Sequence, residues 1–98
     1  MNLYMITTKL PSVITEDFIK LIPKQRALVN KLMDEGKIMQ YSLAMDRSFL
    51  WITISAASEQ EVMDILSSFP LIHYMKPQVQ ELAFYNSVST ELPKLIMN

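Results

Sequence analysis

Residues 37–55, KIMQYSLAMDRSFLWITIS, decide how this chain folds. The stretch contains two runs rich in apolar, β-branched and aromatic residues, at 37–45 and 49–55, and such runs are typical of β-strands. Between them lies Asp46-Arg47-Ser48, a polar tripeptide suited to a tight turn. Two strands joined this closely pair as an antiparallel hairpin. The sequence therefore predicts a hairpin at the centre of the fold.

A helical segment precedes the hairpin. Thr15 offers a hydroxyl that can accept a hydrogen bond at a helix N-terminus, and apolar residues recur at helical spacing over residues 18–32. Gly36 suits the left-handed residue that often closes a helix. Pro23 lies inside this segment and should kink the helix or divide it after Ile22, because proline has no N–H to donate. We therefore expect one helical element with a break.

A second helix follows the hairpin, and one further strand lies near each end of the domain. Ser58 and Glu61 have the spacing of a capping box, and Pro70 ends the apolar periodicity that follows. Residues 2–8 and 78–84 have the composition of strands. The order strand, helix, strand, strand, helix, strand is the split βαβ arrangement. It predicts an α+β fold with a four-stranded antiparallel sheet and two helices on one face.

Length and composition limit the classes of function. Ninety-eight residues fit one domain, which we place at residues 1–86, with a C-terminal tail at 87–98. Nine basic and ten acidic residues give a formal charge of −1, which argues against nucleic-acid binding because phosphate contacts need a cationic surface. The chain has no Cys and one His, which excludes disulfides, thiolate catalysis and clustered Cys or His metal ligands. We therefore expect no metal site built from such ligands.

The N-terminal residues lack the basic and apolar regions of a signal peptide. No window approaches the roughly 20 apolar residues that cross a bilayer, so we expect no membrane partner. These features, with the lack of Cys, predict a cytoplasmic protein.

The predicted strands carry more apolar surface than two helices can cover. A sheet with one wet face should alternate apolar and polar side chains, yet residues 49–55 place Ile52 on one side and both Phe49 and Trp51 on the other. In the preceding strand, four residues share one register: Met39, Tyr41, Leu43 and Met45. A large exposed apolar patch marks an interface, so we expect a homodimer or a higher homo-oligomer. The alternative is a monomer whose own tail covers part of this face.

The tail contains apolar residues where polar ones are usual: Leu92, Leu95, Ile96 and Met97. They could dock on a neighbouring subunit or fold back on their own chain.

Three short motifs resemble the muconolactone isomerase family. Residues 69–79, FPLIHYMKPQV, are similar to that family's stretch between its second helix and its last strand. Lys9-Leu10-Pro11 resembles the break after its first strand, and residues 32–37, LMDEGK, resemble the end of its first helix. The resemblance implies a ferredoxin-like fold that pairs sheet to sheet as a dimeric α/β barrel, often within larger rings. It also implies cofactor-free proton transfer within an unsaturated lactone acid.

Positions that carry the family's chemistry differ in this chain. The resemblance aligns Gln25 and Arg26 with an acidic residue and an adjacent Lys, and Gln40 with a His of the second strand. Gln cannot remove a proton, and Arg holds its own too tightly to act as a base. The alignment therefore implies that the acid and base are replaced, and it leaves a related binding role or a different reaction.

Seven residues are candidates for lining a ligand pocket: Gln25, Arg26, Gln40, Tyr41, Trp51, His73 and Tyr74. His73 could move a proton beside Tyr74, although a loop His without such a role is the commoner case. Gln25 shares a helical face with apolar residues and must bond either a ligand carbonyl or a backbone group. Arg26 could hold a carboxylate, whereas an exposed Arg is the commoner outcome.

Tyr41 and Trp51 lie on adjacent predicted strands. Each has a polar tip on an apolar body, so the pair could form the wall of a small-molecule pocket. Packing in the core or at an interface is the more common fate of such residues.

Two functions remain open. The first is a muconolactone isomerase-like domain that binds a small organic acid or lactone, or acts as a cofactor-free isomerase on a small lactone or carbonyl acid. The second is a non-catalytic oligomerisation or interaction module.

Overall fold

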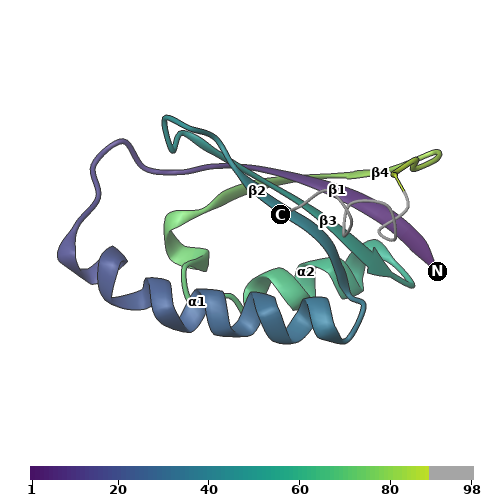
Figure 1. Ribbon diagram of the computed structural model, residues 1–98, viewed down its shortest axis with the longest axis horizontal. Helices are drawn as coiled ribbons and strands as arrows, with labels where there is room; N and C mark the ends of the chain where they lie inside the picture. The colour runs from purple at the N-terminus through teal and green to yellow at the C-terminus, as the bar shows by residue number, and fades with distance from the viewer. Residues whose placement is uncertain (89–98) are drawn as a thin grey trace.

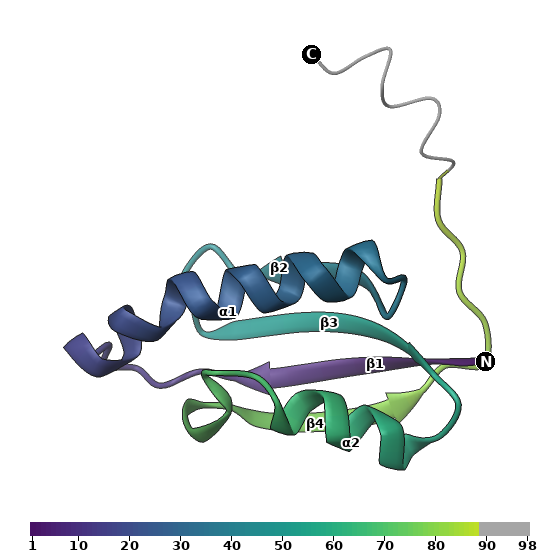
Figure 2. The same ribbon diagram turned by 90° about the horizontal axis from the view of Figure 1, so that it is seen from below.

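A computed structural model describes residues 1–88 and has the predicted element order (Figure 1). The strands and helices are β1 (Asn2–Lys9), α1 (Glu16–Asp34), β2 (Ile38–Leu43), β3 (Phe49–Ala56), α2 (Glu59–Ser67) and β4 (Lys76–Glu81), with a 3-10 turn, η1 (Ile72–Tyr74), before β4. The four strands form one antiparallel sheet in the order β2-β3-β1-β4. Both helices lie on the same face of that sheet, as Figures 1 and 2 show. The predicted fold class is confirmed.

The last strand differs from its expected bounds. It begins at Lys76 and ends at Glu81, whereas the sequence predicts residues 78–84. Pro77 lies inside this strand, opposite Thr8 of β1. A proline is tolerated there because β4 is an edge strand with a partner on one side only.

Helix α1 begins and ends as predicted but has no break. The Thr15 hydroxyl accepts a hydrogen bond from the Phe18 N–H at 3.2 Å, and Gly36 closes the helix with a φ of 77°. The helix continues through Pro23. Because Pro23 has no N–H, the carbonyl of Ile19, four residues earlier, receives no hydrogen bond from the helix. Both residues are exposed, so water can donate to that carbonyl instead.

Helix α2 has the predicted capping box. The Ser58 hydroxyl accepts from the Glu61 N–H at 3.2 Å, and the Glu61 carboxylate in turn accepts from the Ala57 N–H at 2.8 Å. Neither α1 nor α2 is apolar enough over a sufficient length to span a lipid bilayer.

The core lies between the sheet and the two helices. Ile6 and Ile52 face each other across β1 and β3 and are fully buried, as is Ile54. Each such side chain stabilises the fold by roughly 1.5–3 kcal/mol relative to an exposed one. Phe49 and Trp51 point to the opposite face, as predicted.

A bulge in β2 changes the predicted register of that strand. Ile38 is opposite Ile54 and Gln40 is opposite Thr53, so Met39 is the additional residue. As a result Tyr41, which is opposite Ile52, faces the helices, and Met39 is left without a partner in β3. The sequence predicted that Met39 and Tyr41 would point to the same side of the sheet, and this prediction is wrong. The bulge also turns Gln40 to the face without helices.

Candidate functional site

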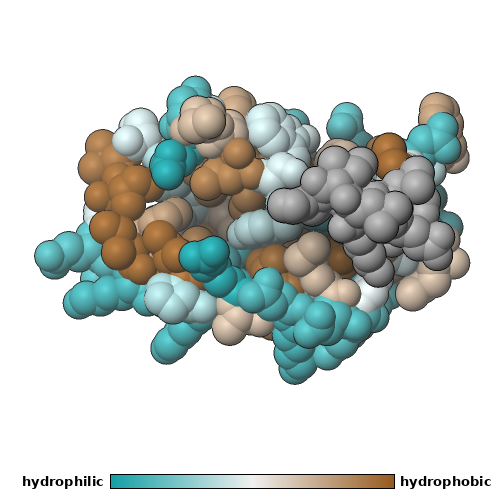
Figure 3. All heavy atoms as spheres, in the orientation of Figure 1, coloured by the Kyte–Doolittle hydropathy of each residue, from teal (hydrophilic) through white to brown (hydrophobic). Residues whose placement is uncertain are grey.

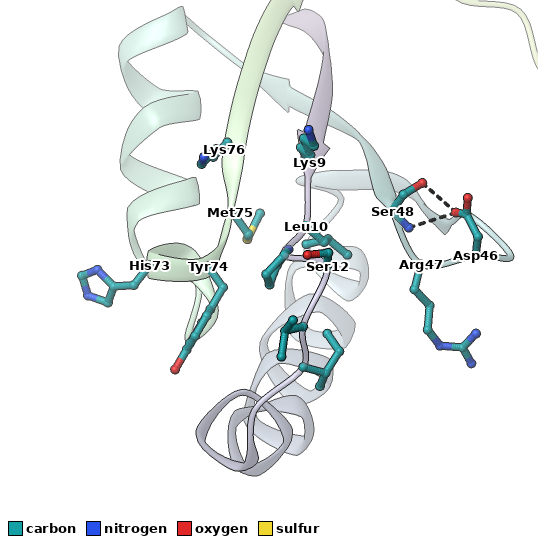
Figure 4. A pocket seen from close by; sticks show the side chains of 13 residues that line it. Lys9, Leu10, Ser12, Asp46, Arg47, Ser48, His73, Tyr74, Met75 and Lys76 are labelled. Atoms are coloured by element: carbon teal, nitrogen blue, oxygen red, sulfur yellow. Dashed lines mark hydrogen bonds between the residues drawn. The ribbon is translucent and has the colours of Figure 1, made fainter.

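An open cleft of about 880 Å³ lies at the end of the sheet where β1 leaves it (Figure 4). The segment that joins β1 to α1, the turn between β2 and β3, and the η1 turn border it. Leu10, Val13, Ile14 and Tyr74 supply its apolar surface, and Met75 lines it from the core, where it is buried. The cleft is therefore built from loops that a rigid sheet and two helices hold in place, as is usual for binding sites.

The first wall of the cleft follows β1. The Leu10 N–H donates to the Ser48 carbonyl at 2.9 Å, which fastens this wall to the β2–β3 turn. Val13 and Ile14 are 71% and 41% exposed, which is unusual for side chains of this size. Figure 3 shows hydrophobic side chains gathered at this end of the molecule. The cleft thus offers apolar surface that the fold itself leaves uncovered.

The second wall is the η1 turn. Tyr74 is half-buried and packs edge-on against Phe18 of α1, with ring centroids 5.2 Å apart. His73 also borders the cleft but is exposed, and in Figure 4 its ring points away from Leu10. Tyr74 is therefore the better placed of the two to contact a ligand.

The rim of the cleft is cationic. Lys9, Arg47 and Lys76 border it, against a single carboxylate, that of Asp46. The Asp46 carboxylate accepts hydrogen bonds from the Ser48 hydroxyl at 2.6 Å and from the Ser48 N–H at 3.0 Å. These bonds lower the pKa of Asp46, so its carboxylate stays ionised at neutral pH. Three cations against this one carboxylate leave the rim with a net positive charge, which favours an anionic ligand.

Gln25 and Tyr41 lie beneath the second wall and bond to each other. Gln25 is buried; its Nε2 donates to the Tyr41 hydroxyl at 3.2 Å, and its Oε1 accepts from the Leu71 N–H at 3.1 Å. Burial raises the pKa of Tyr41, and the bond from Gln25 opposes part of that rise. This pair ties α1 and β2 to the backbone just before η1. Of the two alternatives for Gln25, the structure has the bond to a backbone group.

Gln40 and Trp51 lie on the face without helices. Gln40 donates to the Thr53 hydroxyl at 3.0 Å and accepts from the Ser42 hydroxyl at 2.7 Å. Trp51 stacks on Phe49 with centroids 6.1 Å apart and an interplanar angle of 18°. Neither Gln40 nor Trp51 borders the cleft.

The seven candidates from the sequence do not gather at one place. His73 and Tyr74 border the cleft, Gln25 and Tyr41 support it from below, Gln40 and Trp51 lie on the other face, and Arg26 is exposed on α1. The cations of the rim were not among the residues predicted from the sequence; they are Lys9, Arg47 and Lys76. The register of β1 against β4 could have indicated two of them, since it places Lys9 opposite Lys76.

Comparison with known proteins agrees with this architecture. Residues 3–88 match the model of the muconolactone delta-isomerase family, which is most of the chain. The chain belongs to that family. None of the curated proteins searched matches the chain.

Two solved structures share the family fold. Muconolactone isomerase superposes with a TM-score of 0.70 and 21% identity, over 88% of this chain and 93% of the other. The 5-chloro-2-hydroxyhydroquinone dehydrochlorinase from Burkholderia phenoliruptrix AC1100, solved with 2,5-dihydroxybenzoquinone, gives 0.69 and 16%, over 85% of this chain and 95% of the other. At these identities the likeness shows the fold, and the activity must be argued from the cleft.

The placement of the possible metal-ligating side chains is also informative. Across residues 1–88, no three side chains of His, Cys, Asp or Glu gather in a way that could hold a metal ion. The chemistry of the cleft must be argued from its lysines, arginine, tyrosine and apolar surface.

Proposed function

We propose that this member of the muconolactone delta-isomerase family binds a small organic acid in the cleft between β1, η1 and the β2–β3 turn. The observation that carries the proposal is a cleft that exposes the apolar side chains of Val13 and Ile14 and is bordered by three cations. An apolar patch attracts the body of an organic molecule, and the cations select one with a negative charge.

Each part of such a ligand has a partner in the cleft. Its apolar body can cover Val13 and Ile14 and contact the ring of Tyr74, with a gain of about 25 cal/mol per Å² of buried apolar area. Its carboxylate can accept from the Arg47 guanidinium, which presents paired donors in a plane. Arg26, by contrast, is exposed on α1 and does not border the cleft. Arg47 is therefore the proposed carboxylate anchor.

Proton transfer on a small lactone or carbonyl acid would be carried by the same site. The candidates for a donor or acceptor are Tyr74 and His73, because the Asp46 carboxylate is held by Ser48. We propose binding as the primary function, with isomerisation dependent on a ligand that reaches one of these two side chains.

Titration with pentanoate and with the uncharged pentanamide tests this function, with backbone amide shifts as the measurement. We expect pentanoate to perturb Leu10, Tyr74 and Met75 and to bind more tightly than pentanamide. Arg47→Gln should reduce pentanoate affinity by about tenfold, the effect of one charged hydrogen bond. Arg26→Gln is the matched control and should leave affinity unchanged. Perturbation elsewhere only, or none, would contradict the proposal.

A second candidate function is self-association through the face without helices. Phe49 and Trp51, 36% and 37% exposed, form a stacked aromatic pair there, and Thr53 beside them is already fully buried. We propose that a second copy covers this face as a homodimer, which would remove the aromatic pair from water.

Light scattering on two charge variants tests the dimer. Trp51→Lys should yield monomers, because it places a charge in the proposed interface. Met63→Lys is the control, since Met63 is 43% exposed on α2 in the helical layer. A wild-type protein that remains monomeric at high concentration would reject self-association and leave the cleft proposal intact.

A further inference from the structure

The fold buries one hydroxyl that has no hydrogen-bond partner. Thr8 of β1 has no exposed surface, and within residues 1–88 its Oγ1 is the one buried side-chain polar atom that bonds to no other group. Thr53 is equally buried on the other face of the sheet, but its hydroxyl accepts a hydrogen bond from Gln40 at 3.0 Å. A buried hydroxyl without a partner lowers stability, so its presence is better explained by contact with a bound molecule than by packing.

The neighbours of Thr8 on the sheet are apolar. Leu50 of β3 and Pro77 of β4 are directly opposite Thr8, and Ile6 and Leu10 are two residues away along the chain. A water molecule bound inside a protein needs about two to four polar partners, and these four side chains supply none. A molecule with an apolar body and a single oxygen atom suits such surroundings better.

Thr8 lies directly behind the wall of the cleft. Leu10 follows Thr8 by two residues and Met75 precedes Pro77 by two, so both side chains are on the same side of the sheet as Thr8. Both also border the cleft, and in Figure 4 the Met75 side chain extends from β4 toward β1. Two residues of a strand span roughly 7 Å, which is the depth of Thr8 behind this wall.

We propose that Thr8 is a specificity-determining residue of the cleft, with a hydroxyl that donates to a carbonyl oxygen on the bound organic acid. This inference rests on the proposed organic-acid function and adds a carbonyl group to the ligand's chemistry. A carbonyl oxygen only accepts, so one bond satisfies it. A ligand hydroxyl would bring a hydrogen that also needs an acceptor among apolar side chains.

Met75 is the side chain that must move for this contact to form. It is buried, but its unbranched thioether chain adapts its shape more easily than a branched side chain does. When Met75 turns aside, the apolar body of the ligand takes its place against Leu10. The contact therefore requires a rotamer change and no change in the strands.

Two matched pairs of acids test the carbonyl contact: 4-oxopentanoate against pentanoate, and 5-oxohexanoate against hexanoate. The members of each pair have the same chain and differ by one ketone oxygen, and the two lengths place that oxygen at different distances from the carboxylate. Calorimetry should show at least one oxo acid bound about fivefold more tightly than its partner, the effect of one neutral hydrogen bond.

Three variants assign the preference to Thr8. Thr8→Val should abolish it and leave affinity for the unsubstituted acid unchanged, whereas Thr8→Ser, which keeps the hydroxyl, should retain it. Thr53→Val is the matched control, because it removes an equally buried hydroxyl from the other face and should also retain the preference. Circular dichroism verifies that each variant is folded.

The same variants provide a test without ligand. Thr8→Val should keep or raise the midpoint of urea denaturation, because it removes a hydroxyl that has no partner. Thr53→Val should lower the midpoint, because it breaks the bond with Gln40. A midpoint that falls in Thr8→Val would show that the hydroxyl is satisfied within the folded chain and would overturn the inference.

The binding outcomes separate this inference from the proposed function. Equal affinities within both pairs, or a preference that survives Thr8→Val, would overturn the role of Thr8 alone. Failure of all four acids to bind would overturn the organic-acid function as well.

Discussion

The two faces of the sheet differ in how completely a single chain buries their side chains. On the face that meets the helices, β1 and β3 contribute fully buried apolar side chains such as Ile6, Ile52 and Ile54. On the other face, polar groups and exposed aromatic rings alternate, and the fully buried Thr53 is bonded by Gln40. The first face is complete within one chain. The second is ordered by its own hydrogen bonds yet still exposes Phe49 and Trp51.

This contrast indicates which parts of the molecule can serve a function other than folding. The helical face must be conserved in volume and shape, because a close-packed interior tolerates few changes. The open face and the cleft at the end of the sheet carry charges and exposed apolar groups that the fold does not require. Substitutions that act on one face and not on the other test this difference between the faces.

The largest effect is expected from Ile52→Ala on the helical face. Removing this fully buried side chain should lower the free energy of unfolding by about 2–5 kcal/mol, through lost burial and a residual cavity. Urea denaturation measures it. Trp51→Ala on the open face is the matched variant, and its cost should grow with protein concentration if a second copy covers that face. A cost for Trp51→Ala that equals the cost for Ile52→Ala at high dilution would contradict the comparison.

A smaller loss should follow from Gln25→Leu, which removes the link between the helical layer and the cleft wall. The Leu71 N–H and the Tyr41 hydroxyl would lose their partners, at a cost of about 1–3 kcal/mol for the buried groups. Hydrogen exchange at Leu71 should accelerate more than exchange at Ile52. Arg26→Leu, one position along the same helix but exposed, is the control. Unchanged exchange at Leu71 would show that this link does not hold the wall.

The raised pKa of Tyr41 predicts a loss of stability in alkaline solution. In the unfolded chain this hydroxyl ionises near its ordinary value of 10.0, while burial keeps it protonated to higher pH in the folded state. Its contribution to stability is therefore fully present below pH 10 and is lost as pH rises through the folded pKa. Unfolding free energies measured across this range should fall less steeply for Tyr41→Phe. An identical slope in both proteins would reject this role for Tyr41.

Much of the fold was predictable because its signals are local. The helix caps at Thr15 and Ser58 and the left-handed Gly36 each depend on a few neighbouring residues, and the structure has all three. The uninterrupted α1 was missed because the cost of Pro23 depends on whether its neighbours are exposed, which only the packed structure reveals. The bulge at Met39 was missed for a similar reason, since strand pairing determines it.

The cleft was less accessible to sequence reasoning. His73 and Tyr74 were found because the motif around them is contiguous, and both border the cleft. Lys9, Arg47 and Lys76 come from three segments that only the strand register brings together. Their charges also resemble ordinary surface charges when each is considered alone. Groups that act together across strands need the register before they can be recognised.

The smallest expected effect concerns the lysine pair at the border between the two faces. Lys76→Glu replaces a like-charge pair opposite Lys9 with an opposite-charge pair, and cross-strand pairs of this kind contribute roughly 0.2–1 kcal/mol. Stability without ligand should therefore rise slightly, and the gain should shrink at high salt because both groups are exposed. Lys20→Glu on α1 controls for the change in net charge. The same variant should bind pentanoate more weakly than the wild type, because it lowers the positive charge of the rim, so stability and binding move in opposite directions. A residue kept for folding alone would not show this opposition, and a Lys76→Glu variant that is both less stable and equally able to bind would mean that the repulsion between Lys9 and Lys76 has no part in the site.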